Sequence, residues 1–248
     1  LPNAADIFAI RRSLSMRGLS GLRLAAFKQA LDTRNRFGFQ PRLSQMQSAP
    51  ELEAAPNVLF LVAAYDPNDD PARTQEKIDD RIYVNETRAR CIRLLKEALG
   101  PRFTGGFGRS PFTLKRYADL VAPPESTSQE GYLRTLRSFP ICVASTGLHG
   151  STGWKLAEYI AFGKAVLSEP LVYELPGGFA SGRNYIEFTS PEQCVAGAVR
   201  LIEDSTLRRQ IMRNNAAYYR DYLRPDTLVK NALTRALGLG LGLKVEQG

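Results

Sequence analysis

Short apolar runs alternate along the chain with longer stretches of helical periodicity. The runs cover residues 57–64, 102–104, 141–145, 164–168 and 185–188. The run at 57–64 is almost continuously apolar, which is typical of a central parallel strand covered on both faces. The stretches between them carry apolar residues at helical spacing. We therefore predict an α/β fold in which the strands form one mostly parallel sheet with helices on both faces.

Residues 145–169 join a loop, a short helix and a buried strand in immediate succession, at the edge of the sheet where open α/β folds bind ligands. The loop has small or hydroxyl-bearing side chains, which let backbone N–H groups approach an anion closely. These residues are Thr146, Gly147, Gly150, Ser151, Thr152 and Gly153. Ser151 or Thr152 is expected to cap the helix, whose buried face is predicted from Leu156, Ala157, Ile160 and Ala161. Lys155 and Glu158 are three residues apart and so share one side.

The motif KLAEYIAFGKAVLS at residues 155–168 resembles the donor-binding helix and strand of GT-B glycosyltransferases. The resemblance covers residues 57–233 and is strongest at 141–190. It implies a Rossmann-like domain of the GT-B C-terminal type, with Glu158 on the ribose of a nucleotide-sugar donor and residues 147–153 around its diphosphate. Retaining members often have a second Glu eight residues before the first, and this chain has Gly150 there, with His149 as the nearest polar residue.

Two further side chains are candidate catalytic groups within this resemblance. Lys155, close to the start of the helix, can offset the charge of a diphosphate leaving group. The alternatives are a surface lysine or an ion pair with Glu158. His149, the only histidine, can donate to phosphate or sugar, and a capping or structural role fits it equally well.

Charge is concentrated at the beginning of this 248-residue chain, whose formal net charge is +8. Residues 1–47 hold eight Arg or Lys against two Asp, and residues 19–34 have the pattern of an amphipathic helix. We expect residues 1–50 to be a basic helical arm or the remnant of a first domain. Residues 51–236 are the predicted donor-binding domain, and residues 237–248 a flexible tail.

Several function classes lack support in the sequence. The three cysteines, Cys91, Cys142 and Cys194, are widely spaced, which favours reduced thiols in a cytoplasmic protein. There is no clustered Cys/His set, and the carboxylates of residues 66–70 are more typical of turns than of a metal site. No metal or cofactor is therefore expected. Tyr218, Tyr219 and Tyr222 lie on a predicted helix, so packing is favoured over nucleic-acid stacking.

The function that the resemblance to GT-B glycosyltransferases implies is metal-independent, hexosyltransferase-like glycosyl transfer in polysaccharide biosynthesis. The expected partners are a nucleotide-sugar donor and a glycan or lipid-linked acceptor, with no nucleic acid. The expected location is cytoplasmic, and the basic arm adds attraction to an anionic membrane surface. Two alternatives remain open at this point: a non-catalytic scaffold protein that keeps the fold, and a nucleotide-sugar epimerase.

Overall fold

A computed structural model of the chain describes residues 43–126 and 128–238. The chain divides into two compact units, residues 1–46 and 47–248. Of the first unit only residues 43–46 are described, including the short 3-10 helix η1 (Leu43–Gln45). The predicted basic arm, its amphipathic helix at 19–34 and all but the first two residues of the predicted tail lie outside the described residues. The proposed domain boundaries therefore stay a prediction.

The described part of the second unit contains a five-stranded, fully parallel sheet with the order β2-β1-β3-β4-β5. Its strands are β1 (Val58–Val62), β2 (Phe103–Phe107), β3 (Ile141–Ala144), β4 (Ala165–Ser168) and β5 (Tyr185–Glu187). All five predicted strands are present, and the predicted fold class is confirmed. The order reverses between β1 and β3, which creates a switch point where ligands bind in such folds.

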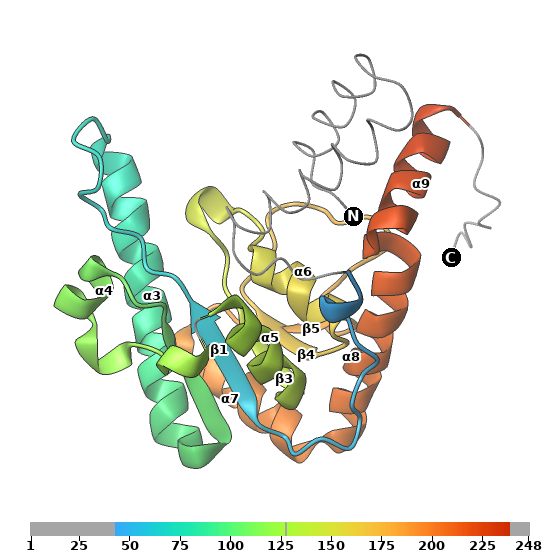
Figure 1. Cartoon of the computed structure of the whole chain (residues 1–248), viewed down its shortest axis with the longest axis horizontal. Helices are drawn as coiled ribbons and strands as arrows, with labels where there is room; N and C mark the ends of the chain where they lie inside the picture. The colour runs from blue at the N-terminus through green and yellow to red at the C-terminus, as the bar shows by residue number, and fades with distance from the viewer. Residues whose placement is uncertain (1–42, 127, 239–248) are drawn as a thin grey trace, which may run out of the picture. The chain divides into compact units, whose positions relative to one another are not determined.

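The helices follow the strands in chain order and cover both faces of the sheet (Figure 1). They are α3 (Gln75–Leu99), α4 (Pro111–Arg116), α5 (Gln129–Ser138), α6 (Trp154–Ala161), α7 (Pro191–Glu203), α8 (Ser205–Tyr218) and α9 (Pro225–Ala236). Short turns are η2 (Gly100–Arg102), η3 (Ala118–Leu120), η4 (Pro124–Ser126), η5 (Leu148–Gly150) and the π-helical η6 (Tyr219–Leu223). Residues 111–120 form two separate elements, α4 and η3, because the backbone leaves helical geometry at Tyr117 (φ −135°, ψ 42°).

The core lies between the sheet and its helices. Alternate residues of β1 point to opposite faces. Val58 and Phe60 belong to the cluster that includes residues of α3 and α7. Leu59 is equally buried but lies outside this cluster, on the face where α5 and α6 pack. The site elements are therefore held by a core on each side of the sheet.

The helix α8 is fixed to the sheet by a buried asparagine. Asn215 donates through Nδ2 to the backbone oxygens of Lys164 (2.8 Å) and Asn184 (2.9 Å). Its Oδ1 accepts from Nδ2 of Asn184 at 3.1 Å. These bonds fasten the starts of β4 and β5 to one side chain. The nearby Tyr218 packs between Phe179 and Tyr222, which agrees with the packing role predicted for the tyrosines.

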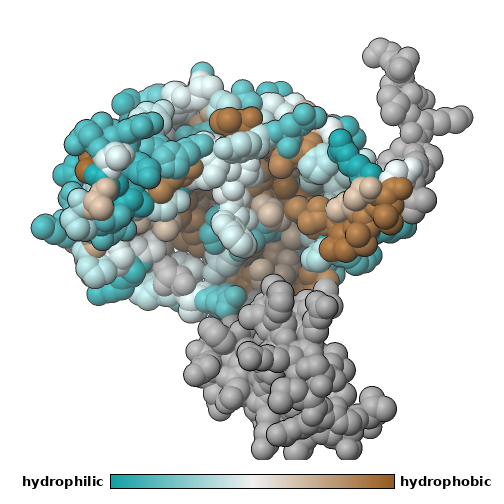
Figure 2. Space-filling model, turned by 90° about the horizontal axis from the view of Figure 1, so that it is seen from above, coloured by the Kyte–Doolittle hydropathy of each residue, from teal (hydrophilic) through white to brown (hydrophobic). Residues whose placement is uncertain are grey.

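The surface near α9 is apolar. Leu228, Val229, Leu233 and Leu237 are exposed on or just after this helix. Figure 2, which looks onto the carboxyl ends of the strands, shows apolar surface on the side where α9 lies. Among the helices of residues 43–126 and 128–238, none is both long and apolar enough to cross a membrane.

Candidate functional site

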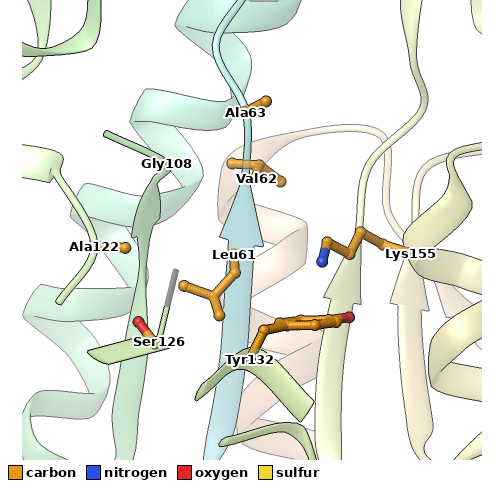
Figure 3. A pocket seen from close by; sticks show the side chains of 8 residues that line it. All are labelled: Leu61, Val62, Ala63, Gly108, Ala122, Ser126, Tyr132 and Lys155. Carbon is orange, nitrogen blue, oxygen red and sulfur yellow. The ribbon is translucent and has the colours of Figure 1, made fainter. Parts of the chain in front are cut away.

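A pocket of about 210 Å³ opens at the carboxyl ends of β1 and β2 (Figure 3). Its wall is built from the end of β1, the residue after β2, the segment before α5, and one side chain each from α5 and α6. The lining residues are Leu61, Val62, Ala63, Gly108, Ala122, Ser126, Tyr132 and Lys155. Most of these are apolar or small, so the charge in the lining comes from Lys155. Of the predicted site residues, Lys155 is the one that lines this pocket.

The loop between β3 and α6 folds into a closed turn beside this edge. The N–H of Gly147 donates to the carbonyl of Ser151 at 2.7 Å, and the N–H of Ser151 donates to the carbonyl of Leu148 at 3.2 Å. Gly150 has φ +66°, and a Cβ there would meet Val172 at 2.9 Å. A side chain at this position would be strained in both backbone and packing. The glycine is therefore required by the turn itself.

The helix α6 begins differently from the prediction. Its N-cap is Gly153, and no side chain within residues 43–126 and 128–238 caps its first turn. The prediction that Ser151 or Thr152 caps it is wrong, because both residues precede the position from which an oxygen reaches the N2 or N3 amide. The hydroxyl of Ser151 instead lies against Gly147. The first-turn amides have no side-chain cap that a ligand would need to displace.

The observed buried face of α6 also differs from the predicted one, since Tyr159 takes the place of Ala157. Leu156, Tyr159, Ile160 and Ala161 are buried, whereas Ala157 is exposed. The prediction named Ala157 and missed Tyr159 because apolar character alone does not separate a small residue from a large aromatic one. Tyr159 lies directly after Glu158, and its burial fixes the rotation of the helix that presents Lys155 and Glu158.

Lys155 and Glu158 come together with Tyr132 of α5. The Nζ of Lys155 lies 3.4 Å from Oε2 of Glu158 and 3.2 Å from the centroid of the Tyr132 ring. The Tyr132 hydroxyl donates to the same Oε2 at 2.6 Å. Burial lowers the pKa of Lys155, while the nearby Glu158 raises it in part. The predicted proximity of Lys155 and Glu158 is confirmed, and the third member was missed from the sequence.

His149 lies on the outer side of the turn. Its backbone is left-handed, with φ 57°, and its N–H donates to Oδ2 of Asp80 at 3.0 Å. The ring Nδ1 is 3.6 Å from the same oxygen, and 60% of the side chain is exposed. Asp80 belongs to α3, so the turn is tied to that helix. In this arrangement His149 has a structural partner, and its predicted role toward phosphate or sugar stays a prediction.

A buried arginine holds the ends of β1 and β3 together. The guanidinium of Arg88, on α3, donates to the carbonyls of Ala63 (2.7 Å) and Thr146 (2.9 Å) and to the hydroxyl of Ser145 (2.9 Å). Burial lowers its pKa, although Tyr65 and then Glu169 act in the opposite direction. Oε2 of Glu169 accepts from the N–H and the hydroxyl of Thr146, at 2.8 and 3.0 Å. Both charged residues were missed from the sequence.

A signal for Arg88 was present in the helix pattern. The buried stripe of α3 includes Asn85 and Arg88 among its apolar members. Long polar side chains inside an otherwise buried stripe are rare unless they are paired. Asn85 bonds both the N–H and the carbonyl of Tyr65, at 2.9 and 2.7 Å. Polar residues in this stripe therefore mark where the helix supports the loops at the site.

The acidic loop after β1 has the structure of a turn. Oδ1 of Asp66 accepts from the N–H of Asn68, and Oδ1 of Asp70 accepts from the N–H of Ala72, each at 2.9 Å. Asp69 forms an ion pair with Arg73. Side chains that bond their own backbone in this way are ordinary turn formers. In the part of the chain that the structure describes, no group of three or more His, Cys, Asp or Glu is placed to hold a metal ion.

Comparison with known families identifies the domain. A family model described as "Glycosyl transferase-like" matches residues 88–233, which include α5, α6 and the whole Lys155–Glu158 region. The chain belongs to this glycosyl transferase-like family. The resemblance to GT-B glycosyltransferases predicted from residues 155–168 is thereby confirmed. A search of curated proteins finds no match.

Solved structures of glycosyl transferases share the fold at low sequence identity. The C-terminal domain of a group 1 glycosyl transferase (LpcC) from Francisella tularensis matches with 17% identity, a TM-score of 0.47 and coverage of 75% of this chain and 95% of that one. Anabaena HepE in complex with UDP matches with 14% identity, a TM-score of 0.50 and coverage of 92% and 70%. Sucrose-phosphate synthase from Thermosynechococcus elongatus has 13% identity, a TM-score of 0.48 and coverage of 91% and 63%. The chain thus spans less than two thirds of the synthase.

Proposed function

We propose that this domain binds the nucleotide-sugar donor of a metal-independent, hexosyltransferase-like glycosyltransferase. The observation that carries the proposal is the pair Lys155 and Glu158, which places opposite charges one turn apart where α6 meets the pocket. A nucleotide-sugar donor has the matching pattern, with an anionic diphosphate next to a ribose that donates hydroxyl hydrogens. Membership of a glycosyl transferase-like family supports the reaction class.

In this proposal each part of the donor has its own residues. The diphosphate lies against the turn and the first amides of α6, at Gly147, Gly150, Ser151, Thr152 and Gly153. Lys155 moves from Glu158 toward the phosphates and stabilises the leaving group as its charge develops. Glu158 accepts the ribose hydroxyls, and His149 donates to phosphate or sugar. Anabaena HepE was solved in complex with UDP, which supports a nucleoside diphosphate as the probe.

The proposal extends to the whole protein in three respects. The acceptor is a glycan or a lipid-linked glycan in polysaccharide biosynthesis. The protein acts in the cytoplasm, where the basic residues of the arm at 1–47 attract an anionic membrane surface. Residues 51–236 form the donor-binding domain, and residues outside it contribute the acceptor site.

The test is calorimetric titration of the whole chain with a panel of nucleoside diphosphates. Glu158→Gln keeps the size of the side chain but loses the charge, so donor affinity falls by about 1.5–3 kcal/mol, the range for a hydrogen bond to a charged group. Lys155→Ala weakens nucleoside diphosphate more than nucleoside, because Lys155 meets the phosphates and not the ribose.

Matched controls separate local from general charge effects. Glu130→Gln on α5 and Lys115→Ala on α4 make the same charge changes at exposed positions. Both variants should bind nucleoside diphosphates with the affinity of the parent. If no nucleoside diphosphate binds to the parent, the proposal fails and a non-catalytic scaffold role is favoured.

A further inference from the structure

Tyr132 occupies an unusual position beneath the charged pair. It is only 8% exposed, and its hydroxyl lies 2.6 Å from Oε2 of Glu158. Figure 3 shows the amino group of Lys155 above the flat face of its ring, 3.2 Å from the centroid. A cation over an aromatic face is attracted by the ring quadrupole. One side chain from α5 therefore contacts both charged residues that α6 contributes to the proposed donor site.

The contacts leave the two oxygens of Glu158 in different environments. Within the described residues, the side-chain contacts of Glu158 to Tyr132 and to Lys155 both end on Oε2. Burial raises the pKa of the Tyr132 hydroxyl, and the neighbouring Tyr159 and Glu158 raise it further. Tyr132 therefore stays protonated and remains a donor across the physiological pH range. Oε2 is therefore held by this bond.

We propose that Tyr132 is a positioning residue for donor binding, which holds the carboxylate of Glu158 in the orientation that recognises ribose. This inference rests on the proposed function. When a diphosphate draws Lys155 away, Oε2 loses its ion pair, and the Tyr132 hydroxyl alone keeps the carboxylate in place. A carboxylate held in one direction discriminates between a hydroxyl and a hydrogen at the ribose 2′ position, because a fixed acceptor cannot turn to another partner.

A matched tyrosine–glutamate pair joins Tyr117, between α4 and η3, to Glu86 on α3. The hydroxyl of Tyr117 donates to Oε1 of Glu86 at 2.9 Å, and Tyr117 is 3% exposed. A cation also lies near its ring, since the guanidinium of Arg116 is 5.8 Å from the centroid. Neither Tyr117 nor Glu86 lines the pocket beside Lys155. Removal of the Tyr117 hydroxyl thus reproduces the chemical change at Tyr132 without touching the proposed site.

The experiment compares Tyr132→Phe with Tyr117→Phe in the whole chain. Tyr132→Phe removes only the hydroxyl and keeps the ring under Lys155. We expect it to bind UDP about tenfold more weakly, at the lower end of the range for a hydrogen bond to a charged group. It should also lose most of the preference for UDP over 2′-deoxy-UDP, a change that a merely structural role would not cause. Tyr117→Phe should retain both affinity and preference. If another nucleoside diphosphate binds the parent best, it and its 2′-deoxy form replace UDP.

A second variant keeps both the carboxylate and the Tyr132 hydroxyl but increases the distance between them. Glu158→Asp shortens the side chain by one methylene and withdraws the carboxylate from Tyr132, so the ribose preference should fall as in Tyr132→Phe. The inference is overturned if the parent binds nucleoside diphosphate and either variant keeps the parental ribose preference within twofold. If the parent binds no nucleoside diphosphate, the proposed function is overturned together with the inference.

Discussion

Replacement of Asn215 tests how α8 is held to the sheet. Asn215 is fully buried, and its amide group bonds the carbonyls of Lys164 and Asn184 and the amide of Asn184. Asn215→Ala removes all three bonds at once. The partners are buried and lie at the starts of β4 and β5, so water cannot replace the lost amide without entering the core.

The expected loss follows from the number of partners left unpaired. A buried polar group that loses its partner costs about 1–3 kcal/mol, and neighbouring groups relax to recover part of this. With three bonds lost and a small cavity formed, we expect the free energy of unfolding to fall by about 3 kcal/mol. Asn215→Asp should be at least as harmful, because a carboxylate would face two carbonyl oxygens.

The assay is urea denaturation monitored by circular dichroism, with Asn214→Ala as the control. Asn214 is the neighbouring residue, and its Nδ2 donates at an exposed position to the carbonyl of Arg183 at 2.7 Å. Its Oδ1 also accepts from Nε2 of Gln210 at 2.9 Å, and because both bonds are exposed to water, removal of the side chain should cost about 1 kcal/mol. The reasoning is refuted if Asn215→Ala and Asn214→Ala differ by less than about 0.5 kcal/mol, the range of ordinary surface substitutions.

Two further predictions concern a glycine and a thiol. Gly106→Ala should prevent stable folding, because its Cβ would lie 2.5 Å from the carbonyl oxygen of Leu120. The control is Gly108→Ala, whose Cβ would meet nothing closer than 3.8 Å. In thermal denaturation this control should melt within a few degrees of the parent. Burial raises the pKa of Cys142 to about 12, against 9.0 for a free thiol. The thiol of Cys142 keeps its proton in the folded protein at pH values where the unfolded chain loses it. The free energy of unfolding is therefore unaffected below pH 9 and falls by about 1.4 kcal/mol per pH unit above it. Cys142→Ala should remove that slope between pH 9 and 10 in denaturant titrations, and an unchanged slope would disprove it.

The sheet could be predicted from the sequence because several of its strands are short apolar runs. The β1 run at 57–64 and the β4 run at 164–168 both mark strands within a few residues of their observed ends. A helix start can be read from the sequence where a side-chain cap exists, as at Ser190 before α7. They were predicted poorly at α6, where Gly153 caps the helix without a side-chain bond. Periodicity identifies the buried face, but the cap depends on local backbone geometry.

The candidate site was only partly predictable because its contacts join distant segments. The pair Lys155 and Glu158 followed from helical spacing alone. Tyr132 is 26 residues from Glu158 in sequence, and only the packing of α5 beside α6 brings them together. Arg88 reaches across 58 residues to Thr146. Neither contact leaves a local pattern, apart from a polar residue within a buried stripe.

The bonds of Arg88 have a consequence for how this site can diversify. Two of its three partners are backbone carbonyls, at Ala63 and Thr146, so the bonds do not depend on which side chains those positions carry. A single residue on α3 thus secures the strand ends on both sides of the switch point. Side chains in the loops can therefore be substituted one at a time to change ligand preference, because the Arg88 bonds keep the strand ends in the same positions.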